Sequence, residues 1–179
     1  MSYKLTAQAV IDRHASTIKE HKPIPTFAEM QEQKIELPHI LIISCADPRC
    51  IPENIFNLKT GEVVTCRVAG GNAQLALNSL LSIDTLLNFS DVIIVQHTNC
   101  GATMFRDNVV KGELRKRAPN LEEEINSMEF YEITGSLQDN VKKSMTFLKE
   151  SPYVPESLKS NIRGFVFHLD NGELEEVTL

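Results

Sequence analysis

The chain has 179 residues, of which 42% are hydrophobic and 23% are charged, the balance of one globular domain. Its net charge of −6 and pI of about 5.4 argue against a nucleic-acid-binding protein, since no stripe of Lys and Arg opposes the acidic balance. No apolar run approaches the ~20 residues of a membrane span, and the first residues lack the apolar segment of a signal peptide, which predicts a cytoplasmic protein with no membrane partner.

The first predicted elements are helical. Apolar residues recur at a helical spacing over residues 6–20, with Thr6 as the capping residue, and a shorter helix is predicted over 26–33 within an irregular segment. The chain carries no internal repeat, low-complexity stretch or linker, so we expect a single domain over residues 1–179.

Strands and helices then alternate along the chain. Apolar runs predict strands over residues 40–44, 62–68, 92–96, 162–169 and 173–179. Helices are predicted over 73–88 and 136–149, a helical turn or two over 53–58, and helical pieces over 103–127 that break at Gly112 and Pro119. Asn171-Gly172 is a strong hairpin signal between the last two strands. The order predicts an α/β fold: a mostly parallel sheet of about four strands, an antiparallel edge strand and flanking helices.

Metal-ligating side chains follow two of these strands. Cys45 comes directly after the strand over 40–44, and His97 and Cys100 come directly after the strand over 92–96. The carboxyl ends of neighbouring parallel strands meet at one edge of a sheet, where ligand sites of such folds lie. Two thiols and one imidazole are soft ligands that favour zinc, and three protein ligands leave one position open, as in a catalytic zinc site.

Two simpler interpretations of the cysteines remain open at this point. Four cysteines are too few for a disulfide scaffold, but thiols also pack as small apolar side chains in a protein core. A purely structural zinc ion would need a fourth ligand, for which Cys50 and Cys66 are the available thiols.

Three sequence motifs together resemble the β-class carbonic anhydrases. They are Cys45-x-Asp47-x-Arg49, Arg67-x-Ala69-Gly70 and His97-x-x-Cys100-Gly101, within a matching segment of about residues 37–105. The short chain is similar to the compact microbial and fungal members. The resemblance implies a Zn²⁺ cofactor on Cys45, His97 and Cys100, and residues 1–36 as an N-terminal helical arm. It also implies a homodimer or homotetramer.

Asp47 and Arg49 flank Pro48, beside the first ligand. They could form a surface ion pair of little energetic value. The resemblance implies instead a catalytic dyad, in which Arg49 holds Asp47 ionised and Asp47 accepts a hydrogen bond from the zinc-bound nucleophile. In some members of the family an unpaired aspartate moves onto the zinc ion.

The resemblance implies that zinc-bound hydroxide hydrates carbon dioxide to bicarbonate. Carbonyl sulfide hydrolases and carbon disulfide hydrolases share this site, so carbonyl sulfide (COS) is the alternative substrate, with a non-catalytic zinc-binding domain as a third hypothesis. Two residues depart from the common family pattern: Val68, where asparagine is frequent, and Gln96, where glycine or histidine is frequent. Both lie near the predicted metal, where a few contacts set substrate selectivity.

Overall fold

The computed structural model describes residues 5–179, and the chain divides into two compact units, Met1–Glu36 and Leu37–Leu179. The first unit contains helix α1 (Ala7–Thr17), a 3₁₀ turn (Ile18–Glu20) and helix α2 (Phe27–Glu32). Threonines begin both helices: the Thr6 hydroxyl accepts a hydrogen bond from the Ala9 amide at 3.1 Å, and Thr26 forms a capping box with Glu29. Both predicted helices are confirmed, with ends one to three residues inside the predicted ranges.

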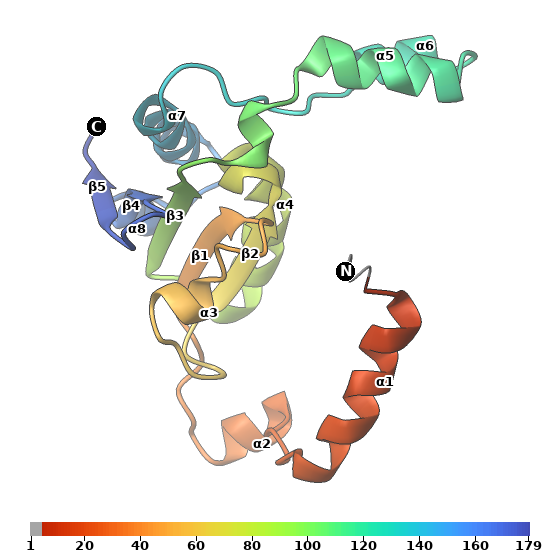
Figure 1. The fold of residues 1–179 in the computed structure, drawn as a ribbon. Helices are drawn as coiled ribbons and strands as arrows, with labels where there is room; N and C mark the ends of the chain where they lie inside the picture. Colours follow the sequence, from red (N-terminus) through yellow and green to blue (C-terminus); the bar gives the residue numbers. More distant parts are fainter. Residues whose placement is uncertain (1–4) are drawn as a thin grey trace. The chain divides into compact units, whose positions relative to one another are not determined.

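The second unit is built on a five-stranded sheet (Figure 1). Its strands are β1 (Ile40–Cys45), β2 (Val64–Val68), β3 (Asp91–His97), β4 (Ile162–Phe167) and β5 (Leu174–Val177), in the spatial order β2-β1-β3-β4-β5. The first four are parallel and β5 pairs with β4 in the antiparallel sense, which confirms the predicted fold class. Ser44 of β1 pairs with Val95 of β3, so both strands end at the same edge of the sheet.

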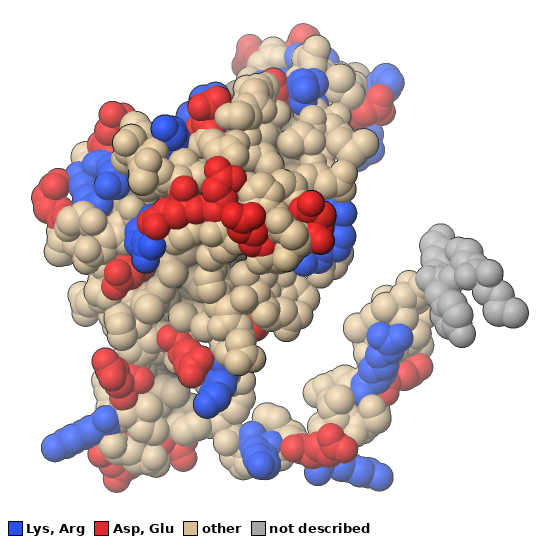
Figure 2. Space-filling model, turned by 60° about the vertical axis from the view of Figure 1, so that its left-hand side comes forward, with Lys and Arg blue, Asp and Glu red and all other residues tan. Residues whose placement is uncertain are grey.

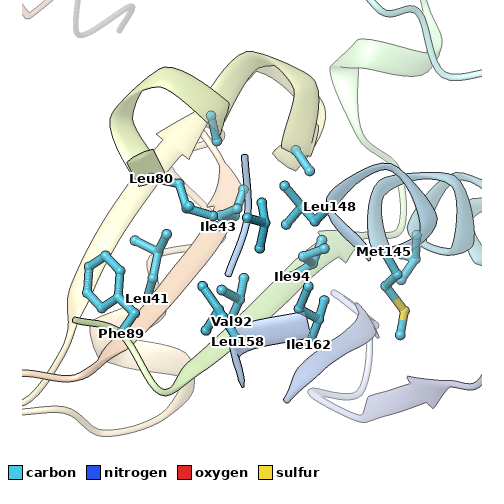
Figure 3. Packing of buried hydrophobic residues seen from close by; sticks show 14 of the residues in the cluster. Leu41, Ile43, Leu80, Phe89, Val92, Ile94, Met145, Leu148, Leu158 and Ile162 are labelled. Atoms are coloured by element: carbon cyan, nitrogen blue, oxygen red, sulfur yellow. The ribbon is translucent and has the colours of Figure 1, made fainter. Parts of the chain in front are cut away.

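Helices α4 (Ala73–Leu87) and α7 (Leu137–Glu150) contact the sheet and each other (Figure 1). The main apolar core lies between these helices and the sheet, with Leu41 and Ile43 from β1, Val92 and Ile94 from β3, and Leu148 from α7 all fully buried (Figure 3). These strand residues alternate with period two. The buried α7 residues Val141, Met145 and Leu148 recur at helical spacing, so each element presents one apolar face.

Two helices of the second unit differ from prediction. Helix α5 (Asp107–Arg117) runs through Gly112 without a break, because a single glycine only weakens a helix. The predicted break at Pro119 is confirmed, since α6 (Glu122–Ser127) starts after it. The short helix α8 (Glu156–Lys159) was not predicted. The helical segment after β1 is one turn, α3 (Pro52–Ile55).

The surface agrees with the acidic composition. On the face shown in Figure 2, acidic side chains form a continuous band, while the Lys and Arg side chains are scattered. Among the described residues, no helix is long and apolar enough to cross a membrane.

Candidate metal centre

The three predicted ligands come together where β1 and β3 end. Cys45 is the last residue of β1, His97 is the last residue of β3, and Cys100 begins the 3₁₀ turn Gly101–Thr103. One potential ligand atom from each residue lies within 4.8 Å of the other two, and all three side chains are buried. The two sulfur atoms are 3.7 Å apart. No other group of three or more His, Cys, Asp or Glu side chains among residues 5–179 has this arrangement.

The imidazole of His97 is oriented for a metal ion. Its Nδ1 lies 2.9 Å from the backbone oxygen of Thr98, so this nitrogen carries the proton and donates it to Thr98. Its Nε2 is fully buried and has no hydrogen-bond partner among the described residues. A buried nitrogen lone pair without a partner is costly in a folded protein unless a ligand satisfies it. The donor set and this unpartnered atom fit a zinc ion.

The two thiols favour a shared negative charge. The hydrogen bond from Cys100 lowers the pKa of Cys45 to about 4, against the opposing effect of burial, and His97 lowers it further. The pKa of Cys100 is raised, first by the same hydrogen bond and then by burial, because its ionisation would put a second charge beside Cys45. The pair therefore loses its first proton readily and keeps the second until a cation replaces it.

Neither of the other cysteines joins this group. Burial raises the pKa of Cys50 to about 11, with a further contribution from the charge of Asp47, which makes this thiol a poor metal ligand. Cys66 packs against the main apolar core. A closed site with a fourth thiolate is therefore absent from the part of the chain that the structure describes.

Asp47 and Arg49 form a bidentate pair beside the three ligand residues. Arg49 Nε donates to Asp47 Oδ1 at 2.9 Å, and Arg49 Nη2 donates to Oδ2 at 2.7 Å. These hydrogen bonds hold the pKa of Asp47 well below its usual range. Asp47 Oδ2 lies 3.8 Å from His97 Nε2, the nitrogen that has no partner. The carboxylate is thus ionised and close to the atom that would face a metal.

Two residues take part in this geometry without a role predicted for them. Arg67, on β2, donates to the backbone oxygens of Cys45 at 3.1 Å and Asp47 at 2.7 Å, which holds the loop after β1. Asn99 accepts two hydrogen bonds from Arg49. Arg67 stood in a recognised motif, but its partners are backbone atoms of a distant loop. For Asn99, the sequence indicated only the general tendency of asparagine to occur in turns.

Glycine at position 71 allows the strand-end loops to pack closely. Gly71 has a φ of +64°, and a Cβ there would lie 2.8 Å from the Val95 oxygen and 3.2 Å from the Cys45 nitrogen. A side chain at this position would therefore collide with the backbone of both strand ends. A smaller apolar cluster of Cys45, Cys100, Ala102 and Ile133, with Phe105 packed against it, surrounds the two thiols.

Comparisons with known proteins identify the family of the chain. The carbonic anhydrase family profile matches residues 40–174. Beta-carbonic anhydrase 1 of Mycobacterium tuberculosis is 30% identical over 141 residues, covering 78% of this chain and 82% of the relative. The structure of a carbonic anhydrase from Glaciozyma antarctica has a TM-score of 0.73 at 27% identity, covering 99% of this chain and 100% of that one.

A carbon disulfide hydrolase in its apo form also shares the fold, with a TM-score of 0.68 at 20% identity, covering 96% of this chain and 92% of that one. The family profile spans most of the chain, and the mycobacterial relative matches over most of both lengths. The chain therefore belongs to the β-carbonic anhydrase family of lyases.

Proposed function

We propose that this protein hydrates carbon dioxide to bicarbonate at a zinc ion held by Cys45, His97 and Cys100. The observation that carries the proposal is the buried His97 Nε2, which has no partner among the described residues, in a side chain that offers a ligand atom within 4.8 Å of those of Cys45 and Cys100. When bound in such a site, zinc lowers the pKa of water from 15.7 to about 7 and so supplies hydroxide at neutral pH.

Asp47 and Arg49 orient the nucleophile in this proposal. An ionised carboxylate only accepts hydrogen bonds, so Asp47 turns the proton of the nucleophile toward itself and a lone pair toward the carbon of the substrate. Arg49 keeps Asp47 ionised through two hydrogen bonds and fixes the plane of the carboxylate. The water oxygen adds to carbon dioxide, and one proton leaves to solvent for each bicarbonate formed.

The second candidate keeps this site and changes the substrate to COS, which would yield H₂S and carbon dioxide. Gln96 is the reason to retain this second candidate. It precedes the proposed ligand His97 in the chain and is 1% exposed, and neither amide atom of its side chain has a hydrogen-bond partner among residues 5–179. Gln96 is next to a proposed ligand in the chain, so its buried and unsatisfied amide is a reason to assay the second substrate. A non-catalytic zinc domain is less well supported, because a structural site needs no ionised carboxylate such as Asp47 beside it.

The remaining proposals concern assembly and location. We infer that the protein is a homodimer or homotetramer, with residues 1–36 as an arm for another subunit. No residue of α1 is buried, and Val10, Ile11 and Ile18 of the first unit are each at least half exposed. All four cysteines are free thiols, which agrees with a reducing compartment such as the cytoplasm.

The test is a pair of assays on protein with verified zinc content: stopped-flow carbon dioxide hydration and H₂S release from COS. We expect rapid hydration and little H₂S. The Asp47→Asn variant should keep its zinc and lose activity by roughly 10²–10³-fold, because the amide cannot replace the carboxylate as an ionised acceptor.

Asp170→Asn, at an exposed turn, is the matched control and should change neither zinc content nor activity. H₂S release that exceeds hydration would favour the second candidate. Full activity in Asp47→Asn would contradict the role of the dyad, and inactivity toward both gases would contradict the enzyme proposal.

A further inference from the structure

We propose that Asn99 is the positioning residue of the dyad: it holds the Arg49 guanidinium in the orientation in which Arg49 pairs with Asp47. The inference rests on the proposed function, because it assigns a role to Asn99 in that same site. Asn99 contacts Arg49 rather than the three ligand side chains, so it would act through Arg49 and not on a substrate.

The hydrogen bonds of Arg49 divide between two residues. Nε and Nη2 donate to the two carboxylate oxygens of Asp47, while Nη1 donates to Asn99 Oδ1 at 3.0 Å and Nη2 donates to the Asn99 backbone oxygen at 3.0 Å. A guanidinium has five N–H donors, and this arrangement uses both of its ends. Asp47 binds one edge of the plane and Asn99 binds the next, so the plane cannot rotate without breaking hydrogen bonds at both.

Arg49 needs this second anchor because it is an exposed side chain. It is 49% exposed, whereas Asp47 is only 13% exposed. Exposed ion pairs are weak, since a long flexible side chain loses entropy when it is held in one geometry. Two more acceptors on the same guanidinium reduce the orientations open to it while Asp47 is paired.

The backbone of Asn99 is shaped for the contact. Its φ of +54° lies in the left-handed region, which asparagine tolerates better than most residues. In this conformation, the side-chain oxygen and the backbone oxygen of Asn99 both accept hydrogen bonds from the Arg49 guanidinium. Asn99 also lies between His97 and Cys100, so Arg49 ties the loop after β1 to the loop after β3.

The consequence is that Asn99 sets how firmly Asp47 is held. Asp47 Oδ2 is 3.8 Å from His97 Nε2, so a small rotation of a released carboxylate would move it toward the metal position. Without the Asn99 side chain, Arg49 should spend more time away from Asp47, and Asp47 should more often leave its orienting position.

The test compares three variants of the zinc-loaded protein. Asn99→Gly removes Oδ1 but tolerates the left-handed φ and keeps the backbone oxygen. Asn99→Asp restores an oxygen acceptor at the same place. Asn88→Gly is the matched control, because Asn88 also has a left-handed φ, of 49°, at the end of α4. Each is measured for zinc content, for the turnover number, and by NMR for the hydrogen-exchange rate of the Arg49 Nε–H.

We expect Asn99→Gly to keep its zinc, to lose turnover on the order of tenfold, and to raise the exchange rate of the Arg49 Nε–H by a similar factor. Asn99→Asp should restore both, and Asn88→Gly should match the wild type. In an Arg49→Ala background, Asn99→Gly should have no further effect on turnover, because its effect passes through Arg49.

An unchanged Arg49 exchange rate in Asn99→Gly would overturn the inference, as would a loss of turnover that persists in the Arg49→Ala background. If the wild type hydrates no carbon dioxide, the proposed function fails. The NMR comparison, which needs no substrate, would still decide whether Asn99 positions Arg49.

Discussion

Strand β3 runs from the apolar core to the candidate metal centre, and the two regions differ in how their buried side chains are satisfied. Val92 and Ile94 are fully buried among other apolar side chains. Gln96 and His97 are equally buried, yet each has a polar atom without a partner among the described residues. An unsatisfied buried polar group costs roughly 1–3 kcal/mol, so the core is complete in itself, whereas the centre leaves polar atoms for water or a ligand to satisfy. Changes in the core should therefore act on folding, and changes in the centre on metal binding and turnover.

The largest effect on metal binding is expected when a proposed ligand side chain is replaced. Cys45→Ser and Cys100→Ser should each fall from about one zinc per chain to a small fraction of that value, because a neutral hydroxyl is a far poorer zinc ligand than a thiolate. Both variants should also melt at a lower temperature than the zinc-loaded wild type, since bound metal stabilises the fold.

Cys66→Ser is the matched control, because Cys66 packs against the core away from the ligand group. It should retain its zinc, as measured by atomic absorption after gel filtration. Full zinc retention in both Cys45→Ser and Cys100→Ser would falsify the ligand assignment.

A substitution in the apolar core should lower the stability of the fold and leave zinc binding unchanged. Leu148 of α7 is fully buried, and Leu148→Ala should lower the free energy of unfolding by about 2–5 kcal/mol through lost burial and a cavity. The folded fraction should still bind zinc in the wild-type ratio. Leu86→Ala, at a side chain that is 71% exposed, is the control and should change stability little. Denaturant titration and zinc analysis would check both, and weakened zinc binding in folded Leu148→Ala would show that the two regions are coupled.

The pH dependence of zinc affinity gives a more graded test. Two of the three proposed ligands have a raised pKa. The pKa of Cys100 is raised mainly by its hydrogen bond to Cys45, and the pKa of His97 is raised as well. Burial alone would lower the pKa of His97, but its interactions with Cys45, Thr98 and Asp47 together outweigh burial. Zinc must displace protons held by groups of raised pKa, so affinity should increase with pH, by roughly tenfold or more per unit near neutrality. Competition against a chromophoric chelator at pH 6, 7 and 8 would measure it, and an affinity independent of pH would contradict this proton linkage.

The contrast between the apolar core and the candidate metal centre also explains which features could be predicted from the sequence. Apolar periodicity and strand-end positions predicted the parallel sheet, its antiparallel edge and the convergence of Cys45, His97 and Cys100, because these follow from local patterns and from the topology of parallel strands. The contacts of Arg67 and Asn99 could not be predicted, since each depends on where a distant loop places a backbone oxygen or a guanidinium. The continuity of α5 through Gly112 was missed for a different reason: the cost of one glycine is small enough for neighbouring residues to offset.

The smallest expected effect lies at Thr98, where the centre joins the C-terminal hairpin. The Thr98 hydroxyl accepts a hydrogen bond from the Leu169 amide at 3.0 Å, and its backbone oxygen accepts one from His97. Thr98→Val keeps the shape and the backbone oxygen but leaves the Leu169 amide without this acceptor, so stability should fall by about 1 kcal/mol. Zinc content should not change, because the orientation of His97 depends on the retained backbone oxygen. Thr85→Val, on exposed α4 surface, removes a hydroxyl that donates to Ser82 and should cost less, since water replaces that contact. Loss of zinc from Thr98→Val would mean that the Thr98 side chain, and not only its backbone, orients His97.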